Sequence, residues 1–253
     1  MNPFLRGFVL ISLAVFCIIS GFLGYTVYSL PDVNRLLVDD PDTTAFMQYR
    51  LETAQNEGLP IVLRQASIPL EDIPRLFQRT VVLAEDAAFW VHEGIDWHEV
   101  QEAMDRNLEE GRIVRGASTI SQQTAKNLYL SPDRNFLRKF KEYLITQDLE
   151  KHLPKKRILE LYLNFIEFGN GVFGIQKAAE YYFGKDPAQM SLSEMVRLAA
   201  IIPAPLSLDP NDPSGSLRWR SREILRRLRH YDFISENQYG ETREQLTRFF
   251  GKF

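Results

Sequence analysis

The chain has 253 residues, of which 45% are hydrophobic and 25% charged, with a net charge of −3 at pH 7. This length allows one globular domain beside an anchoring segment. The ordinary share of charged residues predicts a domain that folds in water, and the near balance of charge argues against nucleic acid as a partner. The single cysteine, Cys17, excludes an intrachain disulfide and a cysteine-based metal site.

An apolar segment near the N-terminus predicts a membrane span. Residues 8–30 contain no charged side chain, and a helix of that length, rising about 1.5 Å per residue, can cross a hydrocarbon core of ~30 Å. A secretory signal peptide is the alternative, but Val27–Pro31 is a poor cleavage site. We therefore expect a short cytoplasmic tail (1–7) and an uncleaved transmembrane helix (8–30). Positive residues on both sides orient the span only weakly, whereas the shortness of the tail favours a cytoplasmic N-terminus.

Residues 31–60 have the composition of a polar stalk or of an entry segment to the domain, and residues 61–253 predict a mainly α-helical domain with few strand signals. Thr119, followed three residues later by Gln122, is a helix-capping signature. Hydrophobic periodicity predicts helices over Pro74–Trp90, Ile95–Glu110, Thr119–Leu128, Asn135–His152, Lys155–Phe168, Gly174–Phe183, Ser191–Ile201, Ser216–Tyr231 and Ser235–Phe250.

An acidic pair, Glu85 and Asp86, lies near the end of the first of these helices, beside Phe89 and Trp90. A carboxylate that aromatic neighbours desolvate has a raised pKa and can act as a general base or acid. The alternative is a solvated carboxylate at a helix end, which is the commoner case for such a pair in isolation.

Amides, hydroxyls and one cation gather in residues 116–127. Gln122 and Lys126 are four residues apart on one helix face, as are Gln123 and Asn127. Such a surface at a helix start suits a sugar or a phosphate. A well-capped surface helix is the alternative.

Further along, Arg138 and Glu142 also share a helix face. They predict either a diphosphate clamp beside a second active-site carboxylate, or an exposed pair worth a few tenths of a kcal/mol. The basic segment 218–229 is expected to be a solvated helix face rather than a nucleic-acid site, with contact to acidic lipid as a further alternative.

Several chemistries are excluded by missing motifs. The four histidines lack the spacing of a zinc protease, and the chain contains no Gly-x-Ser-x-Gly elbow and no Ser-x-x-Lys. No protein motif for a metal site is present.

In this order, the blocks resemble the peptidoglycan glycosyltransferase family, and within it the monofunctional biosynthetic transglycosylases. The residues that match its motifs are Glu85, Asp86, Phe89, His92 and Gly94; Gly116, Ser118, Thr119, Ile120, Gln122, Gln123, Lys126 and Asn127; Arg138, Lys139 and Glu142; Arg157–Asn164 and Gly169–Gly174; and Pro203, Pro205 and Pro210. The departures are Thr124, where the family usually has Leu, the stretch 143–148, and Leu208 in place of Tyr.

The resemblance implies a lysozyme-like, mainly α-helical glycosyltransferase domain with a smaller membrane-proximal lobe, at about residues 95–136. It implies a substrate, lipid II, which is a disaccharide-pentapeptide on undecaprenyl diphosphate. The enzyme would polymerise it into β-1,4-linked glycan with inversion at the anomeric carbon.

The resemblance also implies roles for residues. Glu85 would be the general base, and Lys126 and Arg138, assisted by Lys139, would neutralise the diphosphate. Glu142 would orient that region; no cofactor is required, although Mg²⁺ or Mn²⁺ on the diphosphate near Glu142 is an option. The groove for the donor would be lined by Ser118, Gln122, Gln123 and Asn127, and Asp86 and His92 would also bind substrate.

The implied partners are lipid II, the growing glycan strand, and other wall-synthesis or division proteins. The implied location is the bacterial inner membrane, with the catalytic domain on the periplasmic side. Two alternatives remain: a lytic glycan hydrolase of the same fold, and a non-catalytic scaffold of the wall-building complex. The cations Lys126 and Arg138 favour the polymerase, because a hydrolase of neutral glycan has no diphosphate to bind.

Overall fold

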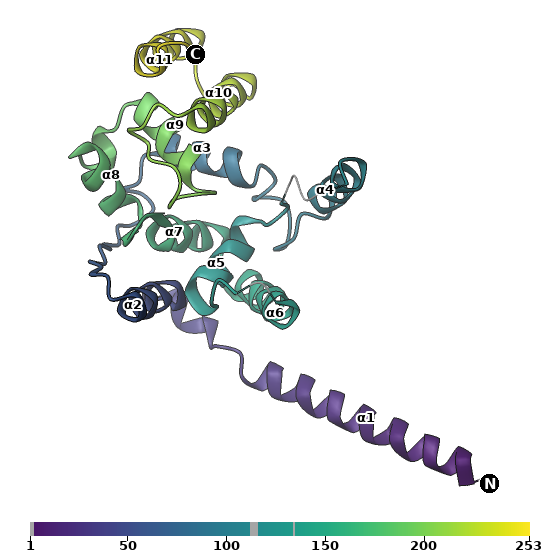
Figure 1. Ribbon diagram of the computed structural model, residues 1–253. Helices are drawn as coiled ribbons and strands as arrows, with labels where there is room; N and C mark the ends of the chain where they lie inside the picture. Colours follow the sequence, from purple (N-terminus) through teal and green to yellow (C-terminus); the bar gives the residue numbers. More distant parts are fainter. Residues whose placement is uncertain (1–2, 112–115, 134) are drawn as a thin grey trace.

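The computed structural model describes residues 3–111, 116–133 and 135–253, and it is mostly helical, as predicted (Figure 1). A long N-terminal helix, α1 (Pro3–Tyr28), projects from a helical domain. The other helices are η1 (Val33–Leu37), α2 (Ala45–Glu57), α3 (Arg75–Glu85), α4 (Trp97–Glu109), α5 (Ile120–Tyr129), α6 (Phe136–His152), α7 (Lys155–Phe165), α8 (Ile175–Phe183), η2 (Pro187–Gln189), α9 (Leu192–Ile201), α10 (Gly215–His230) and α11 (Glu236–Phe250).

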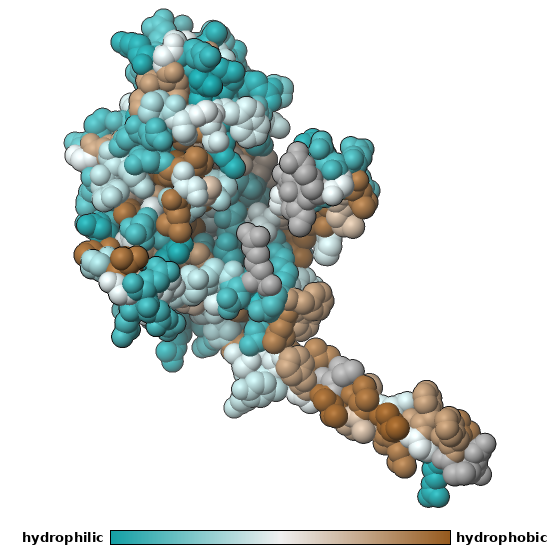
Figure 2. Space-filling model, in the orientation of Figure 1, coloured by the Kyte–Doolittle hydropathy of each residue, from teal (hydrophilic) through white to brown (hydrophobic). Residues whose placement is uncertain are grey.

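Helix α1 is apolar and lies almost wholly outside the packed domain, where Figure 2 shows it as a brown rod. Among the described residues it is the one helix long and apolar enough to cross a membrane. An apolar helix without protein neighbours is unfavourable in water and favourable in hydrocarbon. Helix α1 is therefore consistent with the predicted membrane anchor.

The segment after α1, for which the sequence predicted a polar stalk or an entry segment, is folded onto the domain. Val33 and Leu36 of η1 are buried in the core. The Arg157 side chain on α7 binds this segment through two hydrogen bonds. Its Nε donates to the Leu36 carbonyl (2.6 Å), and a terminal nitrogen donates to the Asp40 carboxylate (2.7 Å). The apolar residues here are too few to show a helical period, which is why the sequence alone did not predict this packing.

The domain has two groups of helices. In one group α5 is central and packs against α2, α6 and α7; in the other, α3 and α10 pack against α9, and α11 packs on α9 and α10. Helix α5 is largely buried, so the lobe expected at residues 95–136 does not form one separate unit: α5 belongs to the core, and α4 stands apart (Figure 1).

The two groups meet where the end of α3 approaches the start of α5. Helix α3 ends at Glu85, and not at Trp90 as periodicity predicted, because Asp86 leaves the helical conformation (φ −161°). Its carboxylate accepts a hydrogen bond from the Ile120 backbone N–H (2.8 Å), the first residue of α5. A carboxylate is favourable at a helix N-terminus, so this bond fixes Glu85 beside α5.

A short antiparallel hairpin, β1 (Glu167–Gly169) and β2 (Val172–Phe173), follows α7, so the helix predicted to reach Phe168 ends three residues earlier. The glycines of this block permit the turn. Gly174 has φ +76°, and a Cβ there would lie 2.4 Å from the Asn164 carbonyl oxygen. The Asn164 side chain in turn bonds the backbone of Ile68 in both directions (3.1 and 2.9 Å).

Candidate active site

Glu85 is the last residue of α3, and it faces α5. Its carboxylate accepts a hydrogen bond from the Gln123 side-chain amide (3.0 Å), and the Gln123 carbonyl oxygen accepts one from the Tyr162 hydroxyl (3.1 Å). Tyr162 is buried on α7. A chain of hydrogen bonds from the core therefore orients the amide that holds Glu85.

Burial raises the pKa of Glu85 above the usual glutamate value. The Gln123 hydrogen bond and the charges of Arg220 and Lys126 act in the opposite direction but do not cancel the effect of burial. A carboxylate with a raised pKa is a stronger base than an exposed one, so Glu85 is suited to take a proton from a hydroxyl group.

Asp86 and His92 contact each other rather than opening to solvent. The His92 Nε2 lies 3.0 Å from both oxygens of the Asp86 carboxylate, and the Gly94 N–H donates to His92 Nδ1 (3.0 Å). Because Nδ1 accepts a hydrogen bond, Nε2 is the nitrogen that donates to Asp86. Together with the bond from Asp86 to Ile120, these contacts position the α3–α5 junction.

Gly94, in the loop between α3 and α4, is required by close packing. Gly94 has φ +90°, and a Cβ there would lie 2.9 Å from the Thr146 methyl group and 3.1 Å from Glu150 Cγ, both on α6. Its carbonyl oxygen accepts a hydrogen bond from the Thr119 hydroxyl (2.7 Å). The loop between α3 and α4 is thereby held against α5 and α6.

The amides and hydroxyls at the start of α5 have different environments. Gln122 forms the predicted capping box with Thr119, its side-chain oxygen accepting from the Thr119 N–H (3.1 Å). Asn127 is also buried, whereas Ser118 is exposed and lines a cavity beside Glu85. Of the four residues predicted to line a groove, Ser118 and Gln123 are thus the ones the structure brings to Glu85.

The cations form a second cluster, between the end of α5 and the start of α6. The Glu142 carboxylate is buried and accepts hydrogen bonds from Arg138 (2.6 Å) and Lys139. Burial lowers the pKa of Lys126; the Glu142 charge raises it, and Arg138 and Lys139 lower it further. A partly desolvated ammonium beside two other cations gains by binding an anion.

The Glu142 carboxylate has one cation on each oxygen. Arg138 donates to one oxygen and Lys139 to the other. Among residues 3–111, 116–133 and 135–253, no group of three His, Cys, Asp or Glu side chains is placed to hold a metal. A metal held by protein side chains alone is therefore not supported in the described residues, whereas a divalent ion bound to the diphosphate near Glu142 stays a prediction.

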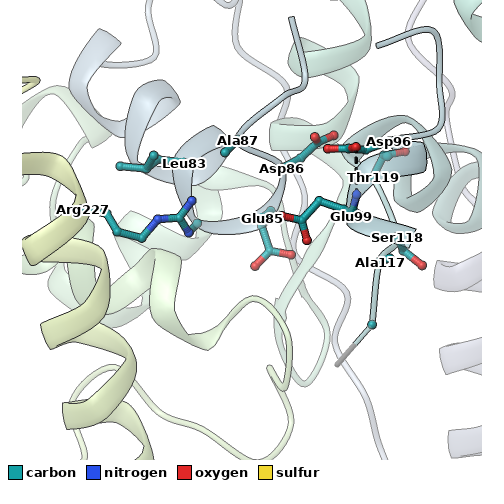
Figure 3. Close-up of a pocket in the computed structure, with 12 residues that line it drawn as sticks. Leu83, Glu85, Asp86, Ala87, Asp96, Glu99, Ala117, Ser118, Thr119 and Arg227 are labelled. Atoms are coloured by element: carbon teal, nitrogen blue, oxygen red, sulfur yellow. Dashed lines mark hydrogen bonds between the residues drawn. The ribbon is translucent and has the colours of Figure 1, made fainter. Parts of the chain in front are cut away.

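Glu85 also lines a cavity of about 140 Å³ that the sequence did not predict. Figure 3 shows Arg227 reaching toward Glu85 from α10, with Ser118 on the opposite side. Arg227 belongs to the basic segment that was expected to be a solvated helix face. No local motif marks it, because only the packing of α10 against α3 brings it to the site.

A desolvated carboxylate and a separate cluster of cations, both at α5, define an enzyme for a substrate with an anionic group. The family model described as Transglycosylase matches residues 58–229. The chain is 46% identical over 189 residues to the biosynthetic peptidoglycan transglycosylase of Nitrosospira multiformis, covering 75% of this chain and 82% of that protein. It is 39% identical over 215 residues to the protein of the same name from Chromobacterium violaceum, covering 85% and 94%.

The chain belongs to the transglycosylase family, as its motifs predicted. A crystal structure of penicillin-binding protein 1A from Haemophilus influenzae matches more weakly, with a TM-score of 0.41 and 21% identity over 71% of this chain and 17% of that one.

Proposed function

We propose that this enzyme is a peptidoglycan glycosyltransferase that polymerises lipid II into β-1,4-linked strands and releases undecaprenyl diphosphate. Membership of the transglycosylase family and relatives named biosynthetic peptidoglycan transglycosylase support a role in building the cell wall. The observation that carries the mechanism is the placement of Glu85 and Lys126 on facing parts of α3 and α5, one a desolvated carboxylate and the other a desolvated cation.

Glu85 removes the proton from the 4-hydroxyl of the acceptor sugar. The oxygen attacks the anomeric carbon of the growing strand, the new O–C bond forms, and the bond from that carbon to the diphosphate oxygen breaks. The nucleophile and the leaving group lie on opposite sides of the carbon, so the configuration inverts. General-base catalysis of this kind contributes typically 10²–10⁴-fold to the rate.

The leaving diphosphate takes the electron pair and carries its own negative charge. Lys126 and Arg138 stabilise the charge that develops on it, and Lys139 assists from a more exposed position. Glu142 holds Arg138 and Lys139 in place. It acts on the substrate through these two cations.

Three cations placed by the protein supply the charge that a metal ion would otherwise supply. We therefore expect activity without a protein-bound divalent ion, and a chelator such as EDTA should leave most of the polymerisation rate. Loss of activity in EDTA that Mg²⁺ restores would contradict this proposal.

A lytic hydrolase is the main alternative. It cleaves a neutral glycan and so needs no cations for a diphosphate, whereas Lys126, Arg138 and Lys139 lie together beside Glu142. A scaffold without activity has no use for the desolvation of Glu85, which costs stability and is typical of functional sites.

The deciding experiment uses the full-length protein in detergent with labelled lipid II, and separates the products by size with and without a glycan hydrolase. We expect a hydrolase-sensitive polymer from the wild type and none from Glu85→Gln. Cleavage of preformed glycan without polymerisation would favour the hydrolase, and absence of both activities would favour the scaffold.

The exposed apolar surface of α1 supports an anchor in the bacterial inner membrane, with residues 1–7 in the cytoplasm and the domain in the periplasm. An anchored site stays near a substrate that cannot leave the bilayer, which raises its effective concentration. Protease added to spheroplasts should degrade the domain; protection of the domain would reverse the orientation. Contacts with other wall-synthesis or division proteins stay a prediction, which crosslinking in cells would test.

A further inference from the structure

Helix α10 carries arginines on two faces with different environments. On its outer face Arg226 pairs with Glu223 (2.6 Å), and Arg229 pairs with Asp232 (2.6 Å). These side chains are largely exposed, so the outer face is the solvated, salt-bridged surface expected from the sequence.

The inner face presents Arg220 and Arg227, which are seven residues apart and so lie on the same side of a helix with 3.6 residues per turn. This side packs toward α3, and Arg227 lines the cavity that Glu85 also lines. In the described part of the chain, no carboxylate forms an ion pair with Arg227. A guanidinium held across a cavity from a carboxylate, without contacting it, keeps its donors available for a ligand.

The size of the cavity limits what it can hold. Its volume of about 140 Å³ is below the ~300 Å³ at the lower end of pockets for whole ligands. It therefore receives one group of a larger substrate whose other parts lie outside.

The lining of the cavity selects that group. The carboxylates of Glu85 and Asp96 in its lining can accept hydrogen bonds and disfavour a phosphate. The Ser118 hydroxyl and the Arg227 guanidinium are donors for a neutral oxygen. A group with an N–H donor for the carboxylates and an acyl oxygen for the Ser118 and Arg227 donors can bind both parts of the lining. The acetamido groups of peptidoglycan sugars are of this kind.

The cavity also lies on the acceptor's side of the reaction. The phosphate-binding cations Lys126 and Arg138 are absent from its lining, whereas the proposed base is part of it. An inverting displacement places the base and the leaving group on opposite sides of the reacting carbon, so the sugar beside Glu85 and away from these cations is the acceptor.

We propose that Arg227 binds the acyl oxygen of the acceptor sugar's N-acetyl group and so positions the 4-hydroxyl at Glu85. This assignment rests on the proposed glycosyltransferase function. Arg227 becomes a substrate-binding residue that determines acceptor specificity, contributed by a helix far along the chain from the other site residues.

The test measures acceptor binding separately from donor binding. Lipid II with a methylated 4-hydroxyl can act only as a donor; it is held at saturation while ordinary lipid II is varied as the acceptor, and the capped tetrasaccharide product is measured. In Arg227→Ala we expect the KM for the acceptor to rise about tenfold or more, as for loss of a charged hydrogen bond, with a smaller change in kcat. Arg227→Lys should give an acceptor KM between those of wild type and Arg227→Ala. The matched control Arg226→Ala should behave as wild type.

A second acceptor, with a hydroxyl in place of the acetamido group on the attacking sugar, identifies the contact. The wild type should lose at least tenfold in kcat/KM with this acceptor, and Arg227→Ala should lose little more than it has already lost. Equal losses in wild type and variant would overturn the assignment.

The pH profile separates binding from an effect on the charge of Glu85. If the acid limb of activity moves in Arg227→Ala while the acceptor KM stays unchanged, Arg227 acts on the base and the proposal is wrong. If wild type polymerises and Arg227→Ala matches Arg226→Ala, the proposal alone fails. If wild type transfers nothing, the proposed function fails with it.

Thermal unfolding of each variant identifies a loss caused by misfolding, in which case Arg227→Lys and Arg227→Gln replace the alanine variant.

Discussion

Glu85 and Glu142 are glutamates of the same proposed site, one half-buried beside a cavity and the other buried, and they have different partners. Glu85 has a neutral amide against its carboxylate, with cations nearby and not in contact, and burial raises its pKa. Glu142 has two cations bound directly to it. A carboxylate left without a bound cation can take up a proton, while one enclosed by cations holds them in position. The partner and not the residue type therefore decides between a base and a positioning group.

The largest effect should come from Glu85→Gln. Polymerisation should fall by at least about 10³-fold, because a neutral amide cannot accept the proton. The fold should stay intact, with an unfolding temperature at neutral pH equal to or above that of wild type, since the variant no longer carries a charge that burial disfavours. Labelled lipid II and calorimetry measure the two effects.

The control for this change is Glu93→Gln, on the exposed surface of the next loop. It should leave both rate and stability near wild type. Wild-type turnover in Glu85→Gln would remove Glu85 from the role of base.

Lys126→Ala should have the next largest effect on rate, a loss of about 10²–10³-fold, as expected for removal of a group that stabilises charge in the transition state. Lys151→Ala, which removes an exposed lysine from α6, is the matched control. The comparison should be made at saturating lipid II. An equal rate in the two variants would place Lys126 outside the diphosphate site.

Glu142→Gln should reduce stability more than it would if Glu142 lay on the surface. The change removes the counter-charge of Arg138, whose side chain is only 15% exposed. Lys139 also loses its partner, but its more exposed ammonium is solvated by water. We expect a loss of about 2–3 kcal/mol in the free energy of unfolding.

The surface pair on α10 is the reference for this prediction. Glu223→Gln, which breaks the exposed pair with Arg226, should cost less than ~1 kcal/mol. Denaturant titration measures both variants, and similar losses would mean that burial of Glu142 does not matter.

The smallest effect should be a shift in the pH profile. Activity requires Glu85 without its proton, so activity rises as the pH rises through its raised pKa. Over the same interval the folded protein loses stability, because a carboxyl group with a raised pKa binds its proton more tightly when folded than when unfolded. Gln123→Leu removes the hydrogen bond that lowers this pKa, so the acid limb should move to higher pH.

Tyr162→Phe is a milder change for the same assay, because it removes only the hydroxyl that orients Gln123. Its acid limb should lie between those of wild type and Gln123→Leu. An unmoved acid limb in both variants would mean that another group controls the profile.

Local signals in the sequence predicted much of the helical structure. The capping box of Thr119 and Gln122, the start of α6 after Asn135 and the start of α9 after Ser191 are as expected, because each depends on side chains within four residues. The predicted helix ends were wrong where distant partners intervene. Asp86, just after α3, bonds to α5, and α7 ends at Phe165, before the hairpin whose following Gly174 approaches Asn164.

The sequence by itself determined the mainly helical fold, the apolar α1, the family, and the residue types that carry the chemistry, since all of these are properties of short segments and their order. Only the tertiary structure decided which polar groups meet. It placed the Gln123 amide in hydrogen-bond contact with Glu85 and the His92 ring in contact with Asp86. It also paired Glu142 with two cations and placed Arg227 in the lining of the cavity. These contacts join helices that are distant in sequence, and the packing of those helices, which no local pattern encodes, sets the burial that raises or lowers each pKa.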